Sequence, residues 1–193
     1  MSQRPGSQLD LLSDLSDLDL VRHLLADLHD DLPEKIARFR MLADLGGQMG
    51  RSGTMIFGGS AAWHTWVEAR SSFVHGNFVA TVLLCQGLIE QLLAAYLHAG
   101  LLIEDLPEKI KFSQTLARCR ERDIITLDDE QDLRRLMNLR NPLSHFRTIN
   151  DGSHLERRSF DESTTPERLL EHDAIFAVGL AVRMLAKPEF RLE

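Results

Sequence analysis

Residues 77–99 read NFVATVLLCQGLIEQLLAAYLHA, and this stretch decides the fold. Its apolar side chains fall on nearly every side of the helix that it predicts, and a helix of that kind is buried by neighbouring elements. Gln86, Glu90 and Gln91 lie near its middle, which argues for a core helix and against a membrane span. The stretch therefore predicts a central helix that other helices must surround.

The segments around this helix carry helical periodicity and helix-start signals, and no segment shows the sustained alternation of a strand. Helices are expected over residues 11–28, 31–45 and 60–75 before the central helix, and beginning near Ser113, Thr126 and Thr165 after it. Residues 150–165 are polar and are expected to form a loop, with a short hairpin between Phe146 and Phe160 left open. The expected fold class is all-α, an up-and-down helical bundle of four to five helices with an N-terminal helical hairpin extension.

The first 59 residues differ from the rest of the chain. Their two expected helices meet at DLPE, residues 31–34, which has the chemistry of a helix start, and they form the hairpin. Residues 46–59 contain six glycines but lack the lysine of a phosphate-binding loop, so they are expected to be a flexible connection. The expected domains are 1–59, an N-terminal helical extension with a Gly-rich connection, and 60–193, a helical bundle.

Composition sets the broad class of the protein. The chain has 193 residues, of which 44% are hydrophobic and 26% charged, which suits one soluble globular protein with a core. A net charge of −7 argues against a protein that coats nucleic acid through bulk charge, but it is compatible with a small basic site. Cys85 and Cys119 lack metal-type spacing and are expected to be buried thiols of a reducing compartment. The N-terminus has no apolar signal core, so we expect a cytoplasmic protein without a membrane span.

Residues 133–147, LRRLMNLRNPLSHFR, combine an unusually placed arginine with a histidine. Arg140 falls on the apolar stripe of its helix, where a guanidinium is unfavourable to bury unless a polar or anionic group meets it. His145 follows five residues later, and an imidazole can exchange protons near neutral pH. Asn141-Pro142 is expected to bend or restart the helix and so to aim Arg140 and His145 into one concave spot.

The pattern of Arg140, Asn141 and His145 is R-x4-H with Asn directly after the Arg, and it resembles the signature of the HEPN superfamily. These are small helical domains that are often metal-independent ribonucleases. The setting also resembles the family: the motif ends a helix and is followed by a loop and a last amphipathic helix. The long apolar helix that contains Glu90 resembles the family's central helix. The resemblance covers roughly residues 61–185.

The resemblance implies a role for each motif residue. His145 would be the general acid or base, Arg140 would bind the scissile phosphate, and Asn141 would orient the phosphate or His145. Ser144 and Arg147 flank the site as supporting residues. One His and one Arg cannot easily fill every role, whereas a homodimer supplies two copies across a twofold axis. The resemblance thus implies an RNA substrate, a homodimer, no metal or other cofactor, and a possible antitoxin or regulatory protein as partner.

The charge distribution is compatible with a small contact to RNA. Residues 134–158 contain six arginines against two acidic residues in an otherwise acidic chain. Phe146 and Phe160 are the candidates for base stacking in this segment. The same arginines also fit an ordinary solvated helix face. Glu90, in the central helix, is either a partly exposed carboxylate or a charge partner for Arg140 or another arginine.

Two function classes remain open. The favoured one is a metal-independent endoribonuclease, acting as a toxin, as a phage-defence effector or in RNA processing, with Arg140 and His145 exposed in a shared cleft. The alternative is a non-catalytic dimerisation or ligand- or nucleic-acid-sensing module, with Arg140 paired to Glu90 or Asp132 and His145 capping or packing. Metal-dependent hydrolysis is disfavoured, because no H-E-x-x-H and no cluster of ligands at metal spacing appears.

Overall fold

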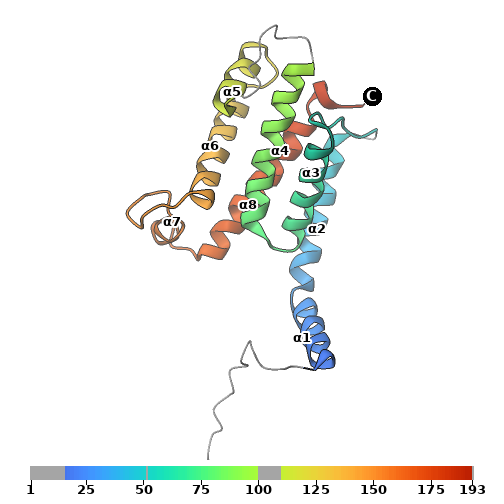
Figure 1. Cartoon of the computed structure of the whole chain (residues 1–193), viewed down its shortest axis with the longest axis vertical. Coiled ribbons are helices and arrows are strands. Elements are labelled where there is room, and N and C mark those ends of the chain that lie inside the picture. Colours follow the sequence, from blue (N-terminus) through green and yellow to red (C-terminus); the bar gives the residue numbers. More distant parts are fainter. Residues whose placement is uncertain (1–15, 51, 100–109, 193) are drawn as a thin grey trace, which may run out of the picture.

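The computed structural model describes residues 16–50, 52–99 and 110–192, and in these ranges the chain is all-α, as expected (Figure 1). The α-helices are α1 (Asp17–Asp30), α2 (Leu32–Gly46), α3 (Gly59–Val74), α4 (Phe78–Ala99), α5 (Phe112–Glu121), α6 (Leu127–Ser144), α7 (Leu155–Asp161) and α8 (Pro166–Leu185). Two short 3-10 helices are η1 (Gly47–Met49) and η2 (Pro188–Phe190). The described ranges contain no strand, only an isolated bridge between Thr54 and Arg191.

Helix α4 is the expected central helix. α3, α5, α6 and α8 pack against it, with α3 and α8 making the most extensive contacts. Its fully buried apolar side chains are Val82, Cys85, Leu88, Ile89, Leu92, Leu93 and Leu97. Ala174, Ala177 and Ala181 are fully buried on α8, and such small side chains let packed helix backbones come close together. The core is therefore built around one helix that is apolar on nearly every side.

By length and composition alone, α4 is the one described helix that could cross a membrane. Four other helices pack against it, as they do around the central helix of a bundle. The two cysteines are part of the same core. Burial raises the pKa of the Cys85 thiol to about 12 and that of the Cys119 thiol to about 12, so both are inert buried thiols, as expected.

The two N-terminal helices both form, but they do not fold back on each other as a hairpin. Helix α2 packs on α3 and α8, whereas α1 continues beyond the end of the bundle (Figure 1). They meet at Asp31, whose backbone stays close to helical geometry (φ −85°, ψ −8°). The DLPE start signal therefore continues a helix here and does not reverse the chain. Residues 11–15, the first part of the expected helix, lie outside the described residues.

Part of the glycine-rich connection is anchored on the bundle, where a flexible link was expected. The Thr54 hydroxyl donates a hydrogen bond to the Leu185 carbonyl at the end of α8 (2.9 Å). The Phe57, Tyr96 and Phe190 rings pack edge to face, with centroids 5.1 to 5.9 Å apart. This aromatic cluster joins the connection to α4 and to the C-terminal η2. It closes the end of the bundle opposite α1.

The polar segment that was expected to be a loop contains helix α7, and the hairpin that was left open does not form. Seven residues are too few to show a clear helical period, and Arg157 and Arg158 look like ordinary surface charge in the sequence. Arg158 donates two hydrogen bonds to the Asp173 carboxylate on α8, at 2.8 and 3.0 Å. Both side chains are largely buried. An ion pair therefore holds α7 against α8.

Asp129 ties the start of α6 to the end of α8. Its carboxylate accepts from the Thr126 backbone N–H (2.9 Å), and the Thr126 hydroxyl accepts from the Asp129 N–H (3.1 Å), which forms a capping box. The same carboxylate lies 2.7 Å from Lys187 and 3.3 Å from Arg183. Burial alone would raise the pKa of the Asp129 carboxyl. Hydrogen bonds from Lys187 and Thr126 outweigh burial, so the pKa is lowered.

Asp129→Asn is expected to reduce the free energy of unfolding by about 1–3 kcal/mol at neutral pH, because Lys187 and Arg183 lose their carboxylate. A carboxyl with a lowered folded pKa stabilises the protein above its unfolded pKa of about 3.9 and loses this contribution as the pH falls. The difference between variant and wild type should therefore shrink below about pH 4. Urea unfolding across pH measures it, with the exposed Asp128→Asn as control. Equal loss in both variants would contradict this role of Asp129.

Candidate functional site

Helix α6 carries the motif and presents it at its C-terminal end. Three leucines fix the rotation of the helix on the bundle: Leu133, Leu136 and Leu139. The expectation of a bend or restart at Asn141-Pro142 is wrong, because the helix continues to Ser144. Proline removes only one backbone donor, and the helix ends two residues later, so little helical bonding is lost. His145 then leaves the helix in an extended conformation (φ −133°, ψ 134°).

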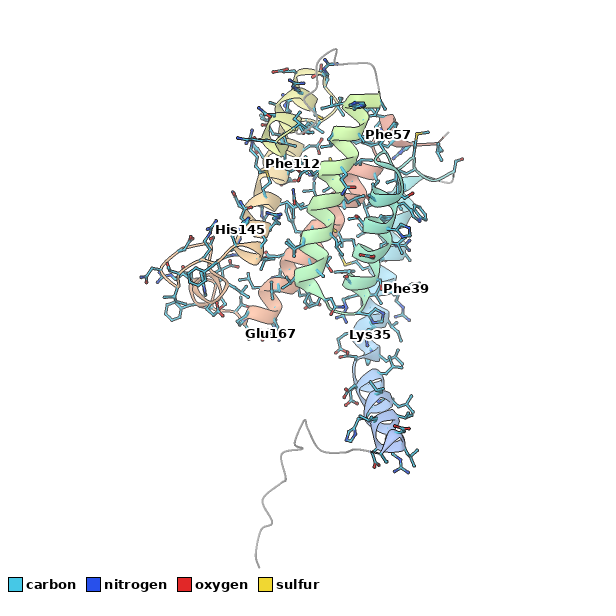
Figure 2. The ribbon with its side chains drawn as sticks, in the orientation of Figure 1. Lys35, Phe39, Phe57, Phe112, His145 and Glu167 are labelled. Atoms are coloured by element: carbon cyan, nitrogen blue, oxygen red, sulfur yellow. The ribbon has the colours of Figure 1, made fainter. Side chains whose placement is uncertain are left out.

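Arg140 lies in the last turns of α6. His145 follows the end of the helix, where the chain turns towards α7 (Figure 2). Arg140 is half-buried and His145 is exposed. Among the described residues, neither side chain forms an ion pair or a hydrogen bond, with the other or with any third residue. The arrangement with both residues buried and paired is therefore not seen in the described part of the chain. Both side chains are accessible to a ligand.

The other arginines of the basic segment are engaged within the chain. Their partners are Glu130 for Arg134, the Phe176 ring for Arg135, Asp151 for Arg147, Asp161 for Arg157 and Asp173 for Arg158. Arg140 is the one arginine of this segment without such a partner in the described ranges. A half-buried guanidinium that no carboxylate neutralises is well suited to bind an anion, since charge-assisted hydrogen bonds are strong away from bulk water.

Ser144 and Asn141 close the end of the helix. The Ser144 hydroxyl lies within hydrogen-bond distance of the carbonyls of Arg140 (3.4 Å) and Asn141 (3.3 Å), to which it donates. The His145 backbone N–H donates to the Asn141 carbonyl (3.0 Å). These bonds satisfy carbonyls that the last turn of a helix leaves without partners. They also hold the backbone from which Arg140 and His145 project.

Arg147 lies in a compact loop that follows the motif. Its Nε is 3.5 Å from a carboxylate oxygen of Asp151. The backbone N–H and the hydroxyl of Ser153 both donate to Asp151, at 2.8 and 2.7 Å. These two bonds, helped by the charge of Arg147, lower the pKa of the Asp151 carboxyl. An anion that approached Arg147 would compete with Asp151, so Arg147 is less available than Arg140.

Neither carboxylate considered as a partner for Arg140 contacts it. Glu90 is half-buried and accepts a hydrogen bond from Gln86 one turn earlier on α4 (2.8 Å). Asp132 pairs with Arg183 of α8 (2.6 Å). Of the two alternatives left open for Glu90, the structure shows the partly exposed carboxylate, held within its own helix, and not the charge partner of Arg140. Asp132 belongs to the network that joins α6 to α8.

Exposed aromatic rings lie close to the motif in the chain. Phe146, directly after His145, is 87% exposed, and Phe160 on α7 is 78% exposed. Ile149, in the loop between them, is also exposed. Exposed rings of this kind bind unpaired bases by stacking, because every base has a flat π-face. The sequence expectation that Phe146 and Phe160 are stacking candidates stays a prediction, but their exposure leaves them available.

The expected concave spot at the motif stays a prediction, since the three hollows described on the surface lie elsewhere. Hollows of about 290, 440 and 590 Å³ occur, and none is lined by Arg140 or His145. Helix α6 runs through Pro142 to Ser144, so the chain break that was expected to form this spot is absent. The described residues also contain no group of three or more His, Cys, Asp or Glu placed to hold a metal ion.

The anchor of α7 was missed in the sequence. Arg158 was counted as part of a basic surface, but it is neutralised by Asp173. The position of Asp173 in the sequence could have revealed this ion pair, since Asp173 lies on the buried face of the last amphipathic helix. A carboxylate in that position requires a cation or several donors.

Comparison of the chain with protein-family models, with curated proteins and with solved structures found no match.

Arg158→Ala is expected to reduce the free energy of opening α7 by about 2–4 kcal/mol, because it leaves Asp173 buried without its partner. The neighbouring exposed pair of Arg157 and Asp161 contributes at most about 0.5 kcal/mol, so Arg157→Ala is the matched control. Hydrogen exchange of the α7 amides measures both. Similar exchange in the two variants would show that the Arg158 ion pair does not hold α7.

Proposed function

We propose that this chain belongs to the HEPN superfamily and is a metal-independent endoribonuclease that acts as a homodimer with a composite site. One observation carries the proposal: four arginines of the basic segment pair with carboxylates and Arg135 lies over the Phe176 ring, while Arg140 is left without a partner among the described residues. Arg140 is also the arginine of the R-x4-H pattern, and the exposed His145 completes that pattern. A purely structural arginine at this position would be expected to find a carboxylate.

The reaction is attack of an RNA 2′-hydroxyl on the adjacent phosphorus. The new P–O2′ bond forms as the P–O5′ bond breaks, which gives a 2′,3′-cyclic phosphate and a 5′-hydroxyl. A base takes the proton of the 2′-hydroxyl, and an acid gives a proton to the leaving 5′-oxygen. His145 fills one of these roles. Arg140 stabilises the extra negative charge on the phosphorane, and Asn141 orients the phosphate or His145.

A second copy of the chain supplies the groups that one chain lacks. The motif has a single histidine, whereas the reaction uses both a base and an acid. A twofold dimer with the ends of α6 facing each other contributes two His145 imidazoles and two Arg140 guanidinium groups to one phosphate. The absence of Arg140 and His145 from the hollows described above fits this arrangement, because the cleft would form only between two chains.

The wider role follows from the same properties. A net charge of −7 restricts RNA contact to a small area, and exposed Phe146 and Phe160 favour unpaired bases there. A cytoplasmic ribonuclease of this kind acts as a toxin, as a phage-defence effector or in RNA processing. An unregulated nuclease harms its own cell, so an antitoxin or regulatory protein is expected as a partner.

Wild-type protein is expected to cleave a mixed RNA pool in the presence of a chelator and to leave 2′,3′-cyclic phosphate ends. His145→Ala should lower the rate about 100- to 10,000-fold through loss of proton transfer. Arg140→Ala should lower it about 100- to 1,000-fold through loss of charge stabilisation. Mass spectrometry of the product ends and gel-based rates measure these effects.

The matched controls are Arg134→Ala, which removes an arginine already paired to Glu130, and His172→Ala, which removes an exposed histidine of α8. Both controls should cleave like wild type. All variants must share the oligomeric state of wild type. A folded wild-type dimer that cleaves no RNA at any pH would overturn the nuclease proposal. It would favour the non-catalytic dimerisation or sensing module instead.

Co-expression of wild type with His145→Ala tests the composite site. If each active site needs both imidazoles, only dimers of two wild-type chains cleave, so activity at equal amounts falls to about one quarter. If each chain acts alone, activity falls to about one half. The activity is measured against the variant fraction, with the ratio of chains determined by mass spectrometry. A linear decline would contradict the shared site.

A further inference from the structure

Helix α1 exposes a continuous apolar stripe and has no buried residue. The stripe consists of Leu18, Val21, Leu24, Leu25, Leu28 and Leu32, which are 45% to 67% exposed. A helix of about 14 residues is marginally stable alone in water. Single exposed leucines are ordinary, but a contiguous apolar stripe marks an interaction site. The helix therefore needs a covering partner, and Figure 1 shows it beyond the end of the bundle, away from the core.

The spacing of the stripe identifies the geometry of that partner. Leu18, Leu25 and Leu32 are seven residues apart, and Val21 and Leu28 follow the first two at three residues. This is the a and d pattern of a two-stranded coiled coil, in which leucines of one helix insert between those of another. Exposed Phe39 on α2 continues the seven-residue series. Lys35 takes the next d position and pairs with Asp31 (3.2 Å), so the apolar seam is confined to about two heptads.

The charges beside the seam select the identity and direction of the partner. Asp17, Leu24 and Asp31 occupy the g positions on one flank, and Arg22 and His29 occupy the e positions on the other. In a parallel pair, a g residue faces the e residue five positions later in the other chain, so Asp17 faces Arg22 of a second copy. In an antiparallel pair, g positions face g positions, so Asp17 of one chain would face Asp31 of the other, which is unfavourable. Among the described residues, Arg22 has only a weak exposed contact, with Asp19 (3.4 Å).

The outer face of α1 disfavours a membrane as the partner. It carries Asp19, Asp27 and Asp30, and α1 has a single arginine. Amphipathic helices that bind membranes carry Lys and Arg on the polar face and are drawn to anionic lipids. An acidic helix would be repelled by such a surface. The seam and its flanking charges fit a second copy of the same helix.

We propose that two copies of the chain pair in parallel through α1, with Leu18, Val21, Leu25, Leu28 and Leu32 in the seam. Parallel pairing places both bundles at the same end of the coiled coil, so that they are held close to each other. The pairing is independent of the proposed cleavage reaction, because it uses no residue of the R-x4-H motif. A seam of two heptads is short, so the pairing stabilises contacts between the bundles and is weak by itself.

Cysteine cross-linking in the full chain tests this pairing. Val21→Cys at a d position is expected to form a disulfide between two chains under mild oxidation, because parallel seam positions meet their own copies. Leu20→Cys is the matched control, since Leu20 is also exposed on α1 but lies on the outer face. The native Cys85 and Cys119 are buried and do not interfere. Non-reducing electrophoresis measures the cross-linked fraction.

A second set of variants tests the seam and its charges. In the Val21→Cys background, Leu25→Glu should reduce the cross-linked fraction at least about fivefold by placing like charges in the seam. Arg22→Asp should weaken cross-linking, and Arg22→Asp with Asp17→Arg should restore it. Equal cross-linking at positions 20 and 21, or none at position 21, would overturn the pairing. The outcome leaves RNA cleavage untested, so failure of this proposal and failure of the nuclease proposal are distinguishable.

Discussion

The burial of α4 is the constraint on which the rest of the structure depends. Most of the surface of this helix is apolar, so neighbouring elements must exclude water from it, and only a narrow stripe that includes Glu90 and Gln91 stays partly exposed. Four helices meet this need, and each is placed by the side of α4 that it covers. Burial of a leucine or isoleucine side chain contributes about 1.5–3 kcal/mol, so the seven buried apolar residues of α4 outweigh any single polar contact in the chain. Buried leucines also hold α6 against the bundle, and they fix the position of its last turn, which carries the motif.

Polar interactions then set the details at the edges of this core. Asp129 joins α6 to α8, and Arg158 joins α7 to α8 through Asp173. Each is a charge at least partly removed from water and paired with an opposite charge. Removing one partner is unfavourable, because the other then stays buried alone. Arg140 differs from these residues. It is half-buried at the other end of α6 and has no carboxylate partner in the described ranges, which is why we propose that it binds a ligand.

Much of the fold is predictable from the sequence, because it depends on strong local signals. The central helix follows from apolar content alone, and the starts of α6 and α8 follow from Thr126 and Thr165, whose side chains cap them. The features that were missed depend on pairings between distant residues. No local pattern reveals that Arg158 meets Asp173 on another helix. The course of α1, which runs on into α2 without folding back, was missed because the DLPE signal starts a helix in either arrangement. The candidate site was found as a motif, but only the structure shows that the neighbouring arginines have partners within the chain.

Binding of an RNA oligonucleotide in which hydrogen replaces every 2′-hydroxyl tests the central claim most directly. Such a strand lacks the attacking group, so binding is observed without cleavage. NMR of the backbone amides and arginine side chains would locate the contact. The account predicts saturable shifts centred on Arg140, Asn141, His145 and Phe146, and their loss in Arg140→Ala but not in Arg134→Ala. Shifts centred on another surface, or no saturable shifts in the folded protein, would contradict it.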